Sequence, residues 1–198
     1  MNTKICLIRH GETEWNKEQR IQGHKNISLS DLGRKQAEKL ASHLQSTRFD
    51  AIYTSDLWRA QETARIIAAK HQLPVTCSTD FRERFCGEWE GLTVDELIRQ
   101  YPDWETVQSV GGKYGIEPTR HVQNRFLRKC ETLAKQHPGG QIAIVAHGFC
   151  ITAFLEAITD GEYGPASGRL LNTSCTHLIY CEDGKWLVQK YNDVSHLK

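Results

Sequence analysis

The chain has 198 residues, the length of one ordinary domain, and we expect a single catalytic domain over residues 1–198. Its 25 Lys and Arg nearly balance its 24 Asp and Glu, which gives a formal charge of +1. Binding to nucleic acid or to an anionic membrane surface generally needs a net basic field, so this balance argues against both. A local basic pocket for a small anionic molecule remains compatible with it.

The sequence also indicates the compartment and the state of the cysteines. No apolar stretch at the amino terminus has the length of a signal peptide, and no segment has the length of a membrane span, so we expect a cytoplasmic protein. The seven cysteines contain no Cys-x-x-Cys pair. The pattern therefore indicates neither a disulfide framework nor a thiolate zinc site.

Strand and helix patterns alternate along the chain. Short apolar runs predict strands over residues 4–8, 50–54, 75–78 and 142–146, and a hairpin of residues 174–181 and 186–191. Apolar residues spaced by three and four predict helices over residues 30–46, 57–68, 122–134 and 149–158, with a short helix after Thr93. Residues 101–118 are expected to be irregular. This order predicts an α/β fold with a mostly parallel sheet, helices on both faces and one antiparallel edge strand.

Chemically active residues follow several of the predicted strands. The first strand runs into Arg9 and His10, and the strand over residues 142–146 runs into His147; a glycine follows each histidine. Ligands of such sheets bind outside the carboxyl ends of the strands. We therefore expect both imidazoles at one crevice.

Two further residues are expected at the same crevice. Arg59 follows the second strand at the predicted start of a helix, where exposed N–H groups favour an anion, and Glu83 follows the third strand. Arginine binds phosphate through a planar fork, neutral imidazole is a nucleophile, and a carboxylic acid can protonate a leaving oxygen. Together these groups suffice for phosphoryl transfer through a phosphohistidine.

The same residues carry a family resemblance that covers nearly the whole chain. The sequence resembles the histidine phosphatase superfamily, also called the phosphoglycerate-mutase-like family. The motifs that carry the resemblance are Leu7-Ile8-Arg9-His10-Gly11-Glu12-Thr13 with Arg20-Ile21-Gln22-Gly23, Thr54-Ser55-Asp56-Leu57 with Arg59-Ala60, Arg82-Glu83-Arg84 with Gly87-Glu88-Trp89-Glu90-Gly91, and Val145-Ala146-His147-Gly148. The resemblance implies a three-layer α/β/α sandwich.

The resemblance also implies the roles of individual residues. His10 would be the phosphorylated nucleophile and Glu83 the proton donor, while Arg9, Arg59 and His147 would hold the phosphoryl group. Further phosphate contacts would come from Asn16, Gln22, Gly23 and Gly148. No metal or other cofactor is expected, because the sequence lacks a His-Glu-x-x-His, an Asp-x-Asp and a Walker-type motif.

Three functions fit these residues. We favour a phosphatase of small phosphomonoesters. The resemblance implies that mutases of the family are longer between the Glu motif and the second histidine, with an inserted cap and a lysine after the glycine that follows the Glu motif. Here the interval between Glu83 and His147 is short, and Leu92 follows Gly91. A mutase, or a non-hydrolytic module that binds a phospho-ligand or phosphoprotein, are the alternatives. Lys113, Tyr114 and Arg120 are expected to shape the substrate site. The substrate's identity and the oligomeric state are left open.

Overall fold

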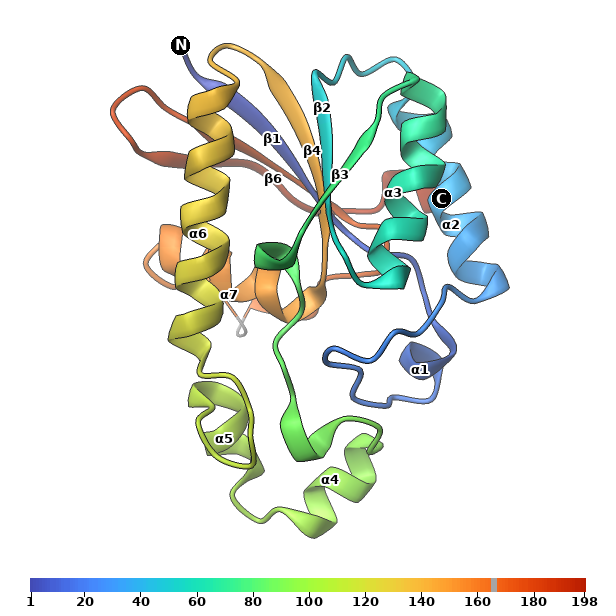
Figure 1. Ribbon diagram of the computed structural model, residues 1–198, viewed down its shortest axis with the longest axis vertical. Helices are drawn as coiled ribbons and strands as arrows, with labels where there is room; N and C mark the ends of the chain where they lie inside the picture. Colours follow the sequence, from blue (N-terminus) through green and yellow to red (C-terminus); the bar gives the residue numbers. More distant parts are fainter. Residues whose placement is uncertain (165–166) are drawn as a thin grey trace.

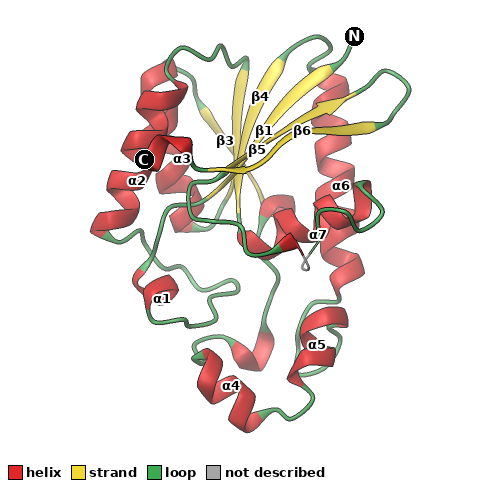
Figure 2. Ribbon diagram, turned by 180° about the vertical axis from the view of Figure 1, so that it is seen from behind, coloured by secondary structure: helices red, strands yellow, loops and turns green. Residues whose placement is uncertain are grey.

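The apolar runs predicted as strands form one six-stranded sheet in the computed structural model, which describes residues 1–164 and 167–198 (Figures 1 and 2). The order across the sheet is β3-β2-β4-β1-β5-β6. The strands are β1 (Thr3–Arg9), β2 (Ala51–Ser55), β3 (Val75–Ser78), β4 (Gln141–Ala146), β5 (Cys175–Tyr180) and β6 (Trp186–Asp193). Strands β3, β2, β4 and β1 are parallel to one another, and β5 is antiparallel to both of its neighbours, β1 and β6. The predicted mostly parallel sheet with antiparallel pairing at one edge is confirmed.

Helices cover both faces of this sheet, as predicted. The helices are α1 (Glu14–Lys17), α2 (Asp31–Leu44), α3 (Trp58–His71), α4 (Val94–Gln100), α5 (Trp104–Val110), α6 (Thr119–Gln136) and α7 (Gly148–Ile158). One core joins α2 and α3 to the side chains of β1 and β4 that include Cys6 and Ile8. The other joins α6 and α7 to the opposite face, with Ile5 and Leu7. Alternate residues of β1 thus enter different cores, which is why both faces of this strand are apolar.

The pairing of β1 with β4 fixes the positions of the two predicted active histidines. Arg9 lies opposite Ala146 in the parallel register, and the N–H of His10 donates to the Ala146 carbonyl at 3.0 Å. His10 and His147 therefore leave adjacent strands at the same level. Gly11 follows, where a Cβ would lie 2.6 Å from the Gly33 carbonyl oxygen, so a glycine is needed for the loop to lie against the start of α2.

A smaller cluster lies beyond the carboxyl ends of the strands, below the sheet in Figure 1. It consists of α4, α5 and the intervening loops, packed around the buried Trp89, Leu97, Val107 and Ile116. The expectation that residues 101–118 are irregular is wrong for α5. Helix α5 has seven residues, and its buried face is a single side chain, Val107, so it has too little apolar periodicity to be predicted. Among the described residues, no helix combines the length and hydrophobicity needed to cross a membrane.

Candidate active site

The two histidines form the buried floor of the site. His10 is 3% exposed and His147 is fully buried, and the centres of their rings lie 5.2 Å apart. His147 is also the residue that precedes α7, in extended conformation, so that its ring emerges where β4 ends and the helix begins. Neither ring nitrogen of His147 has a hydrogen-bond partner among the described residues. Such unpaired buried groups indicate a site prepared for a polar ligand.

Hydrogen bonds fix both the orientation and the tautomer of His10. Its Nδ1 lies 2.7 Å from the carbonyl oxygen of Gly11. A carbonyl oxygen can only accept, so Nδ1 carries the proton and the neutral ring keeps its lone pair on Nε2. The backbone carbonyl of His10 accepts hydrogen bonds from the side chain of Asn172 at 3.0 Å and the N–H of Thr173 at 3.3 Å. The imidazole is thus held with an unprotonated nitrogen available as a nucleophile.

Two buried guanidinium groups lie beside these rings. Arg9 is 5% exposed and Arg59 is 1% exposed, and burial is the main cause that lowers the pKa of each to about 10. Arg59 donates to the carbonyls of Gly23 and Lys25, both at 2.8 Å, and so joins the start of α3 to the loop after α1. The Nε atoms of Arg9 and Arg59 have no partner among the described residues. Two buried cations in one site favour the binding of an anion that carries two negative charges.

These surroundings keep both imidazoles neutral. Burial, together with the positive charges of Arg59 and Arg9, holds the pKa of His10 well below 6.5. Burial and the charge of Arg59 lower the pKa of His147 in the same way. A base with a lowered pKa is unprotonated above that value, so both rings are neutral at physiological pH.

We therefore expect no protonation of His10 or His147 between about pH 6 and 8, where a histidine in an unfolded chain titrates near 6.5. The folded protein then binds fewer protons than the unfolded chain below about pH 6.5. The free energy of unfolding should consequently fall with decreasing pH, by about 1.4 kcal/mol per pH unit for each of the two residues. Ring resonances followed by NMR, with the urea-unfolded protein as reference, test the first statement, and urea titrations at several pH values test the second. If both rings titrated near pH 6.5 in the folded protein, the expected lowering of their pKa values would be wrong.

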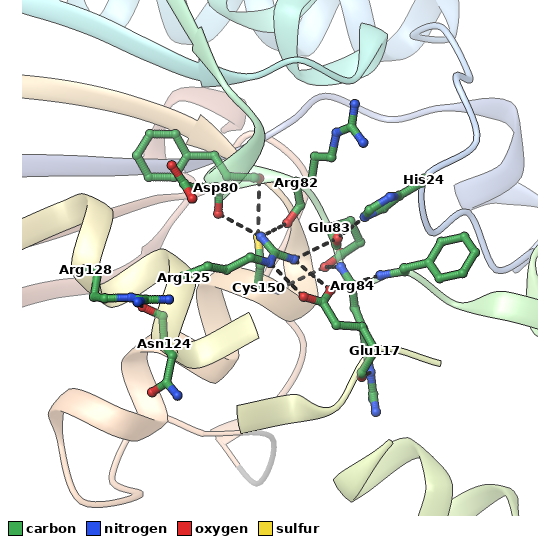
Figure 3. Close-up of polar contacts among 12 residues, drawn as sticks. His24, Asp80, Arg82, Glu83, Arg84, Glu117, Asn124, Arg125, Arg128 and Cys150 are labelled. Carbon is green, nitrogen blue, oxygen red and sulfur yellow. Dashed lines mark hydrogen bonds and ion pairs between the residues drawn. The ribbon is translucent and has the colours of Figure 1, made fainter. Parts of the chain in front are cut away.

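Glu83 projects its carboxylate onto the start of α7. Its oxygens accept hydrogen bonds from the N–H groups of Phe149, Cys150 and Arg84, each at 3.0 Å. These donors place the carboxylate at the start of α7, which follows His147 (Figure 3 shows Glu83 and its surroundings). The loop after β3 thus delivers an acid–base group to the same place as the two histidines.

A cavity of about 440 Å³ opens above these residues. Its lining includes eight of the nine predicted site residues: Arg9, His10, Asn16, Gln22, Gly23, Arg59, Glu83 and Gly148. The ninth, His147, lies next to the ring of His10. Three more arginines line the cavity, Arg20, Arg84 and Arg169, and they were not predicted. They make the cavity strongly basic in a chain with almost no net charge.

Three sequence-based expectations about the substrate side are not met. Lys113 and Tyr114 pair with Asp103, at 2.7 and 3.0 Å, and neither they nor Arg120 line the cavity. The segment instead contributes Gln108 of α5 to the lining. Arg20 and Arg84 stand in motifs that carry the family resemblance, which is the signal that could have found them. Arg169 lies in a loop, where no periodicity separates a cavity residue from a solvated one.

Donor atoms suitable for a metal are found away from the cavity. In the part of the chain that the structure describes, one group of His, Cys and carboxylate side chains has its ligand atoms within 4.8 Å of one another: Cys6, Cys175 and His177. None of these lines the cavity. The cavity offers arginines and imidazoles, a set suited to an oxyanion.

Comparison with known proteins agrees with this geometry. Residues 5–194 match the model of the histidine phosphatase superfamily (branch 1). The chain is 35% identical over 196 residues to the uncharacterized phosphatase PhoE of Bacillus subtilis, covering 98% of this chain and 97% of PhoE. It is 34% identical over 202 residues to a metal-independent phosphoserine phosphatase of Arabidopsis thaliana, covering 98% and 83%. Among solved structures, YhfR of Bacillus stearothermophilus superposes with a TM-score of 0.92 at 31% identity, covering 99% of this chain and 100% of YhfR. The chain belongs to the histidine phosphatase superfamily.

Proposed function

We propose that residues 1–198 form one catalytic domain that hydrolyses small phosphomonoesters without a metal, through a phosphohistidine on His10. The observation that carries this proposal is the His10 ring: its Nδ1 is bound to the Gly11 carbonyl, and its pKa is lowered by burial and by two arginines. A neutral, oriented Nε2 beside cations is what in-line attack on phosphorus needs. The phosphatase names of the two relatives support hydrolysis.

In the first step, the lone pair of His10 Nε2 forms a bond to phosphorus while the bond from phosphorus to the ester oxygen breaks. Arg9 and Arg59, both buried, offset the charge on the three phosphoryl oxygens, and the ring of His147 lies within reach of the same group. Glu83, in its protonated form, transfers a proton to the departing oxygen, so that an alcohol leaves. Positioning and charge neutralisation supply most of the rate enhancement.

In the second step, water attacks the phosphohistidine. Glu83, now a carboxylate, takes a proton from the water, the bond from nitrogen to phosphorus breaks, and inorganic phosphate leaves. His10 recovers its neutral form and Glu83 its proton. The same two residues thus serve both half-reactions, as microscopic reversibility requires of a shared acid and base.

A trapping experiment tests this proposal. The protein is mixed with a ³²P-labelled phosphomonoester in excess chelator and quenched within one turnover. We expect acid-labile label on the peptide that contains His10, together with release of inorganic phosphate across a panel of phosphorylated metabolites. Label on serine or cysteine would overturn the mechanism, and complete loss of activity in chelator would overturn the metal independence. Rapid isomerisation of 3-phosphoglycerate with little free phosphate would identify a mutase instead.

A further inference from the structure

Arg125 of α6 is the centre of a hydrogen-bond network behind the loop that carries Glu83 (Figure 3). Its Nη1 donates to the backbone carbonyls of Asp80 and Arg82, both at 2.7 Å, and its Nη2 donates to the carbonyl of Glu83 itself at 3.0 Å. One guanidinium therefore holds three carbonyls within four consecutive residues. Backbone carbonyls in a loop have no ladder partners, and Arg125 supplies a donor to each of these three. The carbonyl of Glu83 also lies 2.8 Å from Nε2 of His24.

Glu117 orients this guanidinium from the other side. The two side chains form a fork, with Arg125 Nε and Nη2 at 2.9 and 3.0 Å from the two carboxylate oxygens. Burial acts to raise the pKa of the Glu117 carboxyl, but the hydrogen bonds and charge of Arg125 outweigh it and leave that pKa below its usual value. Glu117 also accepts from the N–H of Phe85 at 3.3 Å. Both ends of the segment from Asp80 to Phe85 are thus tied to one ion pair.

Neither residue of this pair lines the cavity. The backbone carbonyl of Glu117 accepts a hydrogen bond from the cavity residue Arg84 at 2.8 Å. Arg125 contacts the backbone of Glu83, whose carboxylate is held at its far end by the N–H groups of Phe149 and Cys150. Hydrogen bonds thus hold Glu83 at both ends of its flexible side chain: at the backbone carbonyl, from Arg125, and at the carboxylate, from α7. A fixed backbone limits the movement of the carboxylate relative to the leaving oxygen.

We propose that Arg125, held by Glu117, is a positioning residue for the proton transfer made by Glu83. This inference rests on the proposed role of Glu83 as proton donor. Through Glu83, Arg125 acts on both proton transfers, to the leaving oxygen in the first step and from water in the second; kcat/KM reports the first of these, and Arg125 is not expected to contact the phosphoryl group. Its loss therefore affects substrates in proportion to their need for that proton.

Leaving groups of different acidity separate this role from a general loss of structure. An alkoxide is a poor leaving group and depends on a general acid, whose contribution is typically 10²–10⁴-fold. A phenolate with electron-withdrawing groups leaves without that proton. The slope of log kcat/KM against the leaving-group pKa therefore measures how well the proton donor works, and kcat/KM reports the step in which the leaving group departs.

The experiment compares Arg125→Gln with Arg128→Gln, a substitution one turn later on the same helix at an exposed position. For Arg125→Gln we expect kcat/KM to fall about 10²-fold on alkyl phosphates, as for other small displacements of a catalytic group. On p-nitrophenyl phosphate it should fall no more than about threefold, because that leaving group needs little of the general acid's contribution. Arg128→Gln should leave both values unchanged. Arg125→Lys keeps the charge without the fork and should show a slope between those of wild type and Arg125→Gln.

Glu83→Gln and Glu117→Gln complete the design. If Glu83→Gln steepens the slope and folded Arg125→Gln does not, the positioning role is overturned while the proposed function stands. If Glu83→Gln itself leaves the slope unchanged, the assignment of the proton donor fails. If thermal melting shows that Arg125→Gln is unfolded, Glu117→Gln replaces it as the test, because this substitution removes the charge of the partner and keeps an acceptor oxygen. A steeper slope in Glu117→Gln supports the proposal, and a wild-type slope overturns it.

Discussion

Replacing His10 with alanine should reduce kcat/KM for p-nitrophenyl phosphate by roughly 10⁴-fold or more, as removal of a nucleophile does in other covalent mechanisms. We do not expect the second imidazole of the site to replace it. His147, 5.2 Å away, precedes α7 and its ring nitrogens bear no hydrogen bond among the described residues that would fix a nucleophilic tautomer. A loss of this size can be measured by steady-state release of p-nitrophenolate.

The same variant should still bind inorganic phosphate. Arg9 and Arg59 remain in place, and the affinity measured by calorimetry should change by less than about tenfold, since the removed ring is uncharged in the wild type. His121→Ala, at an exposed position of α6, is the matched control and should keep full activity. If wild type itself shows no turnover while phosphate still binds, the protein is a phospho-ligand-binding module and the nucleophile has been misassigned.

The arrangement of the strand ends could be predicted from sequence because it follows from local patterns. The apolar runs before His10 and His147 define two buried parallel strands, and parallel strands present their carboxyl ends at one edge of the sheet. The observed register places the two residues side by side. Local periodicity and one topological rule were therefore enough for the floor of the site.

The network around Glu83 could not be predicted in this way. Arg125 occupies a position on α6 that periodicity alone assigns to a solvated flank, next to the core residue Phe126. Three of its five hydrogen bonds reach backbone carbonyls more than forty positions away in the chain, and nothing in the local sequence specifies them. Arg84 is similar: it is 2% exposed and bonds the carbonyls of Val107, Gln108 and Glu117. Such contacts depend on tertiary packing, so a buried arginine looks like a surface one until the fold is known.

Arg59 carries the second large effect, and two substitutions separate its charge from its geometry. Arg59→Lys keeps a positive charge but cannot bond the carbonyls of Gly23 and Lys25 together while presenting a fork to phosphate. We expect kcat/KM to fall about 10²–10³-fold, the loss typical of one preorganised donor at a developing charge. Arg59→Gln removes the charge as well and should fall further.

The two variants should also differ in the protonation of His10. The charge of Arg59 is the second-largest cause, after burial, that lowers the pKa of this ring. Its removal in Arg59→Gln raises that pKa, so the acid side of the activity profile should move toward higher pH, whereas Arg59→Lys should leave it close to that of wild type. Single-turnover rates of phosphohistidine formation between pH 4 and 8, together with NMR titration of the ring, measure the shift. An unchanged profile in Arg59→Gln would mean that burial alone keeps His10 neutral, and Arg59 would then act only on the phosphoryl group.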